Sequence, residues 1–508
     1  MDLRMNRDKC EVIPAAGAAA SFNAHQLFPG CAVCSDQGFK LLGASICNDA
    51  FCKDHTTRRV DKLEALLDKL GELDDVQTAL LLLRHCASFS KLAYSTRVVP
   101  PSLHTEALGL MDDRIRECLN SIARFNLDDT SWSQAQLPVQ KGGLGLRSAE
   151  RHASAAYIGS RVQCESLCAS LDPGFSMGGT RDGPLEAAGV ALRAELPDSD
   201  PASDFRLTQK QLSGLLDDAH YKALRNNPSS TVAFKAHLEL VSQPGAGSWL
   251  HALPCQAVKT NIPPSLMAVA LQRRLRCQLV QDPFFCPFCS EVAGVFADHC
   301  LVCPCNGDRT KRHNVLRNEA FFTLGGAGFQ PELEKPGLLP PRLANEGPPE
   351  HERAVGNGQR RPADVFVPRW RHGMPAALDF AVTSGLRASV LEGSSSDGSS
   401  AATAYETHKR SHLNTESLCS QEGFSFVPLV AEAHGGSWGT EARRAFSNIA
   451  CHAAAAVNGD SSVLADQLAQ RLSCLLQKEN ARAVLRRLPG WIAPSSAASC
   501  DAAVVLAS

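Results

Sequence analysis

Four residues in the middle of the chain have the types and spacing of a zinc site. Cys286, Cys289, His299 and Cys303 follow the pattern C-x2-C-x9-H-x3-C. Two thiolates on a tight turn and a second pair of ligands from the following segment can close a tetrahedron around Zn²⁺. Such closure stabilises a segment with little core of its own, with apparent values of ~10–16 kcal/mol in zinc-finger peptides. The pattern therefore predicts a structural zinc site.

The sequence alone does not decide which residue is the fourth zinc ligand. Cys300, Cys305 and His313 crowd the same region, so that Cys305 or His313 could replace Cys303. The alternative explanation is a set of buried free cysteines, which are common in apolar cores. We favour zinc because both halves of the spacing fit known sites. The pair Cys31 and Cys34 has no regular second pair after it, and there we favour ordinary thiols.

A second candidate site lies downstream and consists of two carboxylates and a lysine. Asp364 precedes a predicted strand, and Asp379 lies in the strand-like segment ALDFAV. Two carboxylates on adjacent strands can share Mg²⁺, which lowers the pKa of a bound water and neutralises charge on a phosphodiester. Lys409 would supply a cation for the transition state. Spacing alone is better explained by a solvated strand end and a surface lysine.

Basic residues flank both candidate sites. A basic segment beside a zinc site is suited to contact phosphates of a nucleic acid. The segment 353–371 contains five arginines and one aspartate. The predicted nucleic-acid contacts are Arg273, Arg274, Arg276, Arg309, Lys311, Arg312 and Arg361.

The elements that carry these residues change along the chain, from mostly helical to mixed α/β. Apolar residues at helical spacing predict helices within 60–86, 105–125, 206–225 and 264–280. Strands are predicted at 365–367, 377–382 and 424–432, with helices at 403–421 and 439–457. Gly-, Pro-, Ser- and Asp-rich composition predicts a linker at 172–204 and a flexible insertion at 388–404. This order predicts a multidomain α+β protein.

The composition excludes several classes of protein. The chain has 508 residues, 44% of them hydrophobic, and a formal charge of −2, so a uniformly basic nucleic-acid coat is excluded. Its charged start does not have the pattern of a signal peptide, and no apolar run approaches the ~18 residues of a membrane span. Twenty cysteines are too dilute for a disulfide scaffold. We expect an intracellular protein, nuclear or cytoplasmic, without a membrane partner.

The order of the motifs resembles the C-terminal half of a non-LTR retrotransposon polyprotein, of the branch with a restriction-enzyme-like endonuclease. LRMNRDKCEVI and GFKLLGASI look like the end of a reverse transcriptase palm, and GSWLHALP and LQRRLRCQL are similar to its connector helices. CPFC…DHCLVCPCNGDRTKRHNVLRNEAF resembles the CCHC zinc knuckle of the family. RRPADV…ALDFAVTS…YETHK…FSFVPLVAEAHGGSWG is similar to its PD-(D/E)xK nuclease, an α/β domain.

The resemblance implies a division of the chain into seven segments. These are a palm remnant at 1–60, a thumb and connection at 61–170, a linker at 171–205, a helical connector at 206–280, a zinc knuckle at 281–308, the endonuclease at 309–460, and a C-terminal helix with a disordered tail at 461–508.

It also implies roles for particular residues. Asp364 and Asp379 match the magnesium carboxylates, Lys409 matches the catalytic lysine, and Glu432 is a weaker match near the site. An alanine separates Pro362 from Asp364, and position 381 is Ala where many relatives have lysine, so Lys409 must act in its place.

The implied activity is Mg²⁺-dependent nicking of DNA that leaves a 3′-hydroxyl, by a truncated product with structural Zn²⁺. The fingers and most of the palm are absent, and no Tyr/Phe-x-Asp-Asp motif occurs, so the chain is not a polymerase on its own. The implied partners are the DNA target, the element RNA and a reverse transcriptase palm supplied in trans. A second hypothesis is a zinc-dependent nucleic-acid binder with a dead nuclease fold. A third is an inert fragment.

Overall fold

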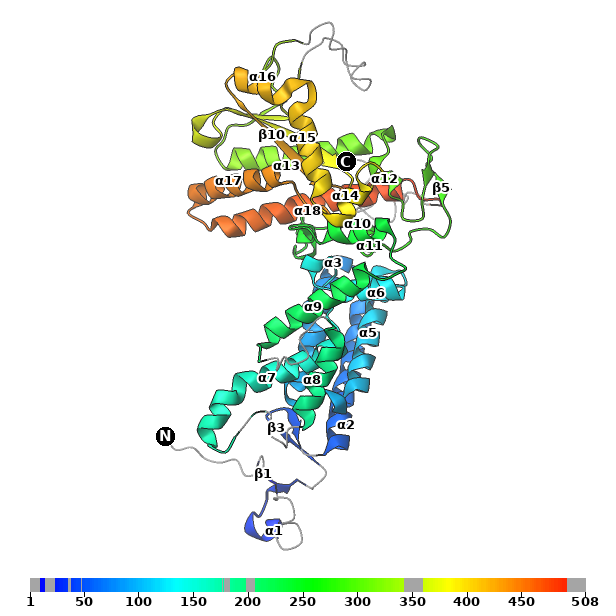
Figure 1. The fold of residues 1–508 in the computed structure, drawn as a ribbon, viewed down its shortest axis with the longest axis vertical. Helices are drawn as coiled ribbons and strands as arrows, with labels where there is room; N and C mark the ends of the chain where they lie inside the picture. Colours follow the sequence, from blue (N-terminus) through cyan, green and yellow to red (C-terminus); the bar gives the residue numbers. More distant parts are fainter. Residues whose placement is uncertain are drawn as a thin grey trace. The chain divides into compact units, whose positions relative to one another are not determined.

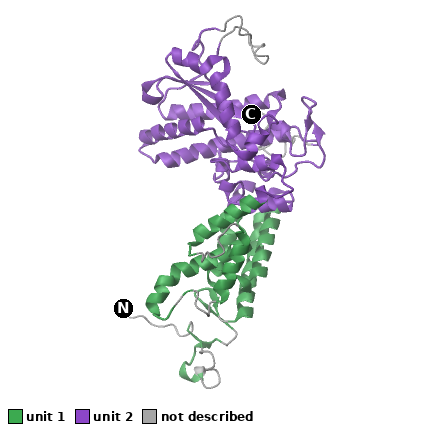
Figure 2. Ribbon diagram, in the orientation of Figure 1, with its two compact units in different colours: residues 1–73, 82–122, 146–223 green, residues 74–81, 123–145, 224–508 purple. Residues whose placement is uncertain are grey.

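The computed structural model describes residues 10–13, 23–34, 38–46, 48–175, 177, 183–197, 206–341 and 360–490. It is a mostly helical α+β structure with small sheets, which agrees with the predicted class (Figure 1). The chain forms two compact units (Figure 2). Unit 1 consists of Met1–Leu73, Leu82–Ile122 and Leu146–Ala223, and unit 2 of Asp74–Leu81, Ala123–Gly145 and Leu224–Ser508. No described helix is long and apolar enough to cross a membrane.

The first half of the chain is helical except for short strands. Its helices are α1 (Ala24–Leu27), α2 (Asp49–Gly71), α3 (Val76–Cys86), α4 (Ala93–Val98), α5 (Thr105–Ala123), α6 (Asp129–Gln136), α7 (Ala149–Leu171), α8 (Gly183–Glu195) and α9 (Gln209–Arg225). Its strands are β1 (Glu11–Val12) with β2 (Ala32–Val33), and β3 (Phe39–Leu41) with β4 (Ala44–Ile46). The predicted helix at 60–86 is two helices, because the Asp75 carboxylate accepts the backbone N–H groups of Gln77 and Thr78 and begins α3.

The predicted linker at 171–205 contains a packed helix, which corrects that prediction. Helix α8 has apolar residues at helical spacing, and Ala188 and Leu192 are buried in the core of unit 1 against Ile158 of α7. Burial of this apolar face stabilises the helix in spite of the Gly- and Pro-rich sequence beside it. Residues 178–182 and 198–205 lie outside the described residues.

The second half contains the predicted strands. Its helices are α10 (Val232–Val241), α11 (Pro264–Arg274), α12 (His299–Val302), α13 (Asp308–Gly326), α14 (Leu391–Ser396), α15 (Ser400–Ser411), α16 (Thr415–Gln421), α17 (Thr440–Val457) and α18 (Ser461–Leu485). Its strands are the pair β5 (Phe284–Phe285) and β6 (Val292–Ala293), and the sheet strands β7 (Glu332–Leu333), β8 (Val365–Val367), β9 (Ala376–Thr383) and β10 (Ser425–Glu432). The C-terminal helix is α18, and residues 491–508, which include the predicted tail, lie outside the described residues.

The four-stranded sheet has the order β10-β9-β8-β7. β10 runs parallel to β9, whereas β8 is antiparallel to both of its neighbours. Alternate residues of β9 point to opposite faces. Leu378 and Phe380 join the core formed with α13, α17 and α18, while Ala377 and Ala381 pack on the side of α15 and α16. Figure 1 shows these two helical layers on either side of β10. Asp379 is two residues away from both Ala377 and Ala381, so its side chain is on the same face of the sheet as theirs.

The predicted flexible insertion at 388–404 is helical, which is a second correction. It contains α14 and the start of α15, where Ala401 and Ala402 are buried and Ala402 packs against Val430 of β10. The predicted helix at 403–421 is also divided, because Leu413 and Asn414 have positive φ angles of 51° and 56° between α15 and α16. Small alanine side chains allow α15 to lie close to the sheet, and this contact decides the structure of a segment that composition alone assigns to a loop.

Candidate functional site

The structure brings together the four residues of the predicted zinc motif. Cys286 and Cys289 lie on the turn after β5, His299 begins α12, and Cys303 follows that helix. The Sγ atom of Cys303 lies 3.9 Å from that of Cys286 and 3.6 Å from that of Cys289, and the Cys289 Sγ lies 3.0 Å from the His299 Nε2. A tetrahedron with Zn–S bonds of 2.3 Å has S···S edges of about 3.8 Å. The cluster can therefore hold a zinc ion.

The geometry decides among the alternative ligands. All four ligand atoms of the cluster lie within 4.8 Å of one another, and the group includes Cys303. Cys305 lies outside this group, and His313 instead contacts Asp364. Burial opposes ionisation of Cys286, but backbone N–H groups of Phe288 and Cys289 outweigh it and lower the pKa of the thiol to about 6. A lowered pKa supplies the thiolate that binds a metal.

Arginines of and after α18 connect the cluster to the rest of unit 2. Arg482, Arg486 and Arg487 all pair with the buried carboxylate of Asp308, the first residue of α13. Arg487 also donates to the backbone oxygen of Cys305 at 3.0 Å, and its guanidinium lies 5.0 Å from the ring centre of Phe288. These contacts place Asp308 and the Cys-rich segment in fixed positions against α18.

The three arginines before the cluster are internal, which corrects their prediction as nucleic-acid contacts. Arg274 donates to the backbone oxygens of Val139, Gly143 and Ala246. Arg276 donates to both carboxylate oxygens of Asp298 at 2.8 and 2.7 Å, and Arg273 donates to the backbone oxygen of Phe296. The three side chains have their partners inside the protein, so they do not form a phosphate-facing surface.

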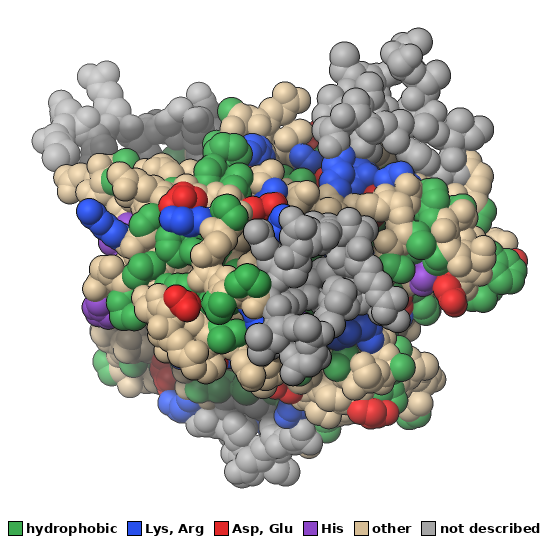
Figure 3. Space-filling model, turned by 90° about the horizontal axis from the view of Figure 1, so that it is seen from above, with side chains coloured by type: hydrophobic (Ala, Val, Ile, Leu, Met, Phe, Trp, Pro, Cys, Tyr) green, Lys and Arg blue, Asp and Glu red, His purple; other side chains and the backbone are tan. Residues whose placement is uncertain are grey.

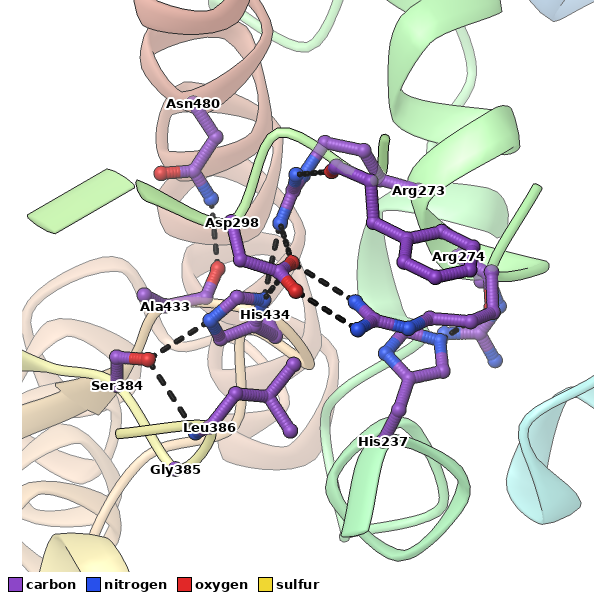
Figure 4. A network of polar contacts seen from close by, with 12 residues as sticks. His237, Arg273, Arg274, Asp298, Ser384, Gly385, Leu386, Ala433, His434 and Asn480 are labelled. Carbon is purple, nitrogen blue, oxygen red and sulfur yellow. Dashed lines mark hydrogen bonds and ion pairs between the residues drawn. The ribbon is translucent and has the colours of Figure 1, made fainter. Parts of the chain in front are cut away.

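The same network contains an aspartate, a histidine and a serine, with the histidine in contact with both of the others. His434 lies 3.6 Å from Asp298 and 2.8 Å from the Ser384 hydroxyl (Figure 4). A hydrolase triad needs the histidine to accept the serine proton. Here Arg273, which is always protonated, lies 2.9 Å from Nδ1 of His434 and donates to it. The proton of the neutral ring then resides on Nε2, which donates to Ser384, so the group is structural.

The two predicted magnesium carboxylates face each other across the β8–β9 ladder. Val365 pairs with Leu378, and one further step in this antiparallel register places Asp364 opposite Asp379. Residues at opposite positions have Cβ atoms about 4.5–5.5 Å apart on one face of the sheet. Asp364 Oδ2 accepts the backbone N–H of Phe380 at 2.6 Å and contacts the His313 Nε2 at 3.0 Å. Hence the pair is close and Asp364 is held in one orientation.

Lys409 faces this pair from the last turn of α15. Its Nζ lies 2.9 Å from Asp379 Oδ2. Both residues line a pocket of about 120 Å³ together with Arg360, Arg361 and His412. Burial, opposed by the charge of Lys409 and reinforced by that of Asp364, raises the pKa of Asp379 to about 6. A carboxylate in this environment is stabilised in its ionised form by any added positive charge.

His313 also belongs to this site, although the sequence pattern predicted it only as an alternative zinc ligand. Burial lowers its pKa, but the hydrogen bond and charge of Asp364 outweigh burial and raise it. His313 lies on α13, 51 residues before Asp364. No spacing rule connects the two positions, so the contact could not be found from the sequence.

Glu432 does not join the carboxylate pair. It is fully buried at the end of β10 and accepts the backbone N–H groups of Gly385 and Gly435. In the β9–β10 register, Asp379 pairs with Pro428 and Glu432 pairs with Thr383. Four residues along a strand correspond to about 13 Å. Glu432 therefore stabilises the turn after β10 and lies away from Asp379.

The remaining basic residues differ in exposure. Arg309 and Arg361 are exposed, Arg361 near Glu334, whereas Arg312 is buried. Lys311 is half-buried, and burial lowers its pKa. On the face seen in Figure 3, Lys and Arg side chains lie in separate groups among hydrophobic and acidic ones. This agrees with the exclusion of a uniformly basic coat.

No protein-family model matches the chain, and no curated protein matches it either.

Proposed function

We propose that this chain is a Mg²⁺-dependent nuclease that nicks DNA, with its catalytic residues in a restriction-enzyme-like domain. The observation that carries the proposal is the position of Asp364 opposite Asp379, with Lys409 2.9 Å from Asp379. These residues come from two strands and a helix, and they have the types that metal-dependent hydrolysis of a phosphodiester requires.

The donor set suits Mg²⁺. This ion is usually bound by one or two carboxylates and keeps several waters, and two carboxylates on one sheet face provide that number. The ion would supply an activated water and neutralise charge on the phosphate. Burial and the negative charge of Asp364 raise the pKa of Asp379. A cation bound beside Asp379 would stabilise its ionised form, and this supports a metal site here.

The protein's own residues have separate roles in this proposal. The backbone N–H of Phe380 and the imidazole of His313 hold Asp364 in place. Asp379 is oriented by its ion pair with Lys409. When a phosphate enters the pocket, the lysine amine can turn from Asp379 to the phosphate oxygens, where it would stabilise the charge of the transition state.

The proposal includes the family resemblance. In it, the chain is a product of a non-LTR retrotransposon that acts in the nucleus or cytoplasm on target DNA and element RNA. Its helical first half corresponds to the reverse transcriptase thumb and connector. The Cys286–Cys303 cluster is a knuckle that holds structural Zn²⁺. The knuckle contributes to nucleic-acid binding, and the nick leaves a 3′-hydroxyl.

The test is nicking of supercoiled plasmid by the purified full chain in the presence of Mg²⁺. We expect conversion to the open circle, abolished in Asp364→Asn and Asp379→Asn and lowered roughly 100-fold or more in Lys409→Gln. Asp466→Asn is the matched control, because Asp466 is an exposed aspartate on α18. Equal nicking by wild type and Asp379→Asn would show that the site assignment is wrong.

The second candidate is a zinc-dependent nucleic-acid binder without catalysis. The ion pair between Lys409 and Asp379 favours it, because a permanent pair would occupy the carboxylate that the metal needs. DNA binding that depends on zinc, without nicking at any Mg²⁺ concentration, is the result that selects this candidate.

A further inference from the structure

A second pocket of unit 2 lies beyond the end of β9 and has a strongly basic lining. Its volume is about 120 Å³, which is room for several water molecules. The polar side chains that line it are Arg309, Arg312, Thr383, Ser384, Arg387 and Tyr405. Three of these are guanidinium groups, and no carboxylate of the described residues lines the pocket. Neither the carboxylate pair nor the zinc cluster uses it.

Arg312 is the buried cation of this pocket. Its side chain is only 5% exposed. Nη1 donates to Asn480 Oδ1 at 2.8 Å and Nη2 to the Leu301 carbonyl at 2.9 Å, and both partners are neutral. Within the described part of the chain, its Nε has no partner and no carboxylate lies within ion-pair distance. An unpaired buried charge is unfavourable, and an anion would remove that penalty.

The nearby carboxylate of Glu432 does not fill this role. Its two oxygens accept backbone N–H groups of Gly385 and Gly435. Burial and the positive charge of Arg309 lower the pKa of Arg312 to about 10, although Glu432 opposes the shift. The pocket thus retains positive charge in excess of what the surrounding protein neutralises.

The other lining groups are arranged as donors. Arg387 is held in place by donating to the Thr383 hydroxyl at 3.0 Å and to the Ser384 carbonyl at 3.2 Å. Arg309 is exposed, and its guanidinium makes no hydrogen bond or ion pair with another described residue. Guanidinium groups with hydroxyls beside them form a donor set that matches a tetrahedral oxyanion.

We propose that this pocket binds a phosphate of the nucleic-acid strand that flanks the cleaved bond. This inference rests on the proposed nuclease function. Thr383 lies four residues after Asp379 on β9, about 13 Å along the strand. Tyr405 lies one turn before Lys409 on α15, a rise of about 6 Å. At 3.4 Å of axial rise per nucleotide, these spans correspond to about two to four nucleotides.

The test measures DNA affinity separately from cleavage. All variants are made in the Asp379→Asn background, in which no strand is cut, and a fluorescent duplex oligonucleotide is titrated at several salt concentrations. We expect Arg309→Gln/Arg387→Gln to bind roughly 10-fold more weakly, with a salt slope smaller by about 0.9, the value for one phosphate. Both residues are exposed, so the variant should fold. Arg443→Gln, an exposed arginine outside the pocket, is the matched control.

A second arm distinguishes free phosphate from the DNA backbone. Inorganic phosphate at constant ionic strength should weaken DNA binding by the parent protein and leave that of the double variant unchanged. Equal DNA affinity and slope for parent and double variant would overturn the inference, even if inorganic phosphate stabilises the parent. An equal loss in Arg443→Gln would also overturn it, since the effect would then be general charge. Failure of plasmid nicking with these affinity differences intact would count against the proposed function alone.

Discussion

The Nε2 atom of His313 lies 3.0 Å from Oδ2 of Asp364, so a residue of the helix after the Cys-rich segment touches the carboxylate pair. α13 begins at Asp308, five residues after Cys303, and Asp308 is fixed by Arg482, Arg486 and Arg487. The single helix α13 therefore connects the Cys286–Cys303 cluster with the candidate catalytic site. Loss of order in the cluster should reach Asp364 through this helix.

The first prediction concerns the ligands of the zinc cluster. Cys289→Ser and Cys303→Ser should lose bound zinc and lower the free energy of unfolding by several kcal/mol, because a closed Cys3His site stabilises its segment. Cys305→Ser should retain one zinc per chain, since Cys305 lies outside the group of ligand atoms. Metal analysis and thermal unfolding provide the two measurements. Retention of zinc by Cys303→Ser would contradict the assignment.

The second prediction concerns His313. His313→Gln should retain zinc and should lower plasmid nicking about 10- to 100-fold, as is typical when a residue that orients a metal ligand is changed. His452→Gln, an exposed histidine on α17, is the control. If His313→Gln lost zinc instead, the original alternative of a histidine ligand at this position would be restored.

The third prediction is a pH dependence of stability due to Asp379. Its pKa is raised from 3.8 to about 6, mainly by burial, so the folded state binds the proton more tightly than the unfolded state. This contribution is present below pH 3.8 and is lost as the pH rises through about 6. Without added divalent cation, wild type should lose up to about 3 kcal/mol relative to Asp379→Asn between pH 4 and 7. Denaturant unfolding of both proteins at each pH measures this difference. If the free energy of unfolding changed equally with pH in wild type and Asp379→Asn, the prediction would be wrong.

The fourth prediction separates Glu432 from catalysis. Glu432→Gln should lower the free energy of unfolding by about 2 kcal/mol, because two buried N–H groups lose a charged acceptor. Nicking per folded molecule should stay at the wild-type rate, since Glu432 lies away from Asp379. A folded Glu432→Gln protein that no longer nicks would place Glu432 in the site after all.

Local pattern was sufficient for the strands and for the zinc motif. Residues 365–367 form β8 as predicted. The prediction at 377–382 is one residue shorter than β9 at each end, and the prediction at 424–432 begins one residue before β10. Short apolar runs bounded by turn residues indicate strands that are buried on both faces. Cys286 and Cys289 are likewise set by a single turn.

The composition of a segment, by contrast, was a poor guide where packing decides. Small residues at 388–404 and in α8 indicate loops when considered alone, but they form helices because neighbouring elements bury their alanines. The sequence gives no information on which surface will lie against such a segment.

Local sequence pattern was enough to identify the residue types available for metal, acid and phosphate chemistry and the elements on which they lie. Tertiary structure decided which of them meet: Cys303 as the fourth member of the cluster, His313 on Asp364, and Arg273, Arg274 and Arg276 in the interior. The physical reason is that a charged side chain has the same local sequence signature whether water or a buried partner surrounds it. Only the fold fixes its distance to groups far away in the chain, and with it the solvation that governs its chemistry.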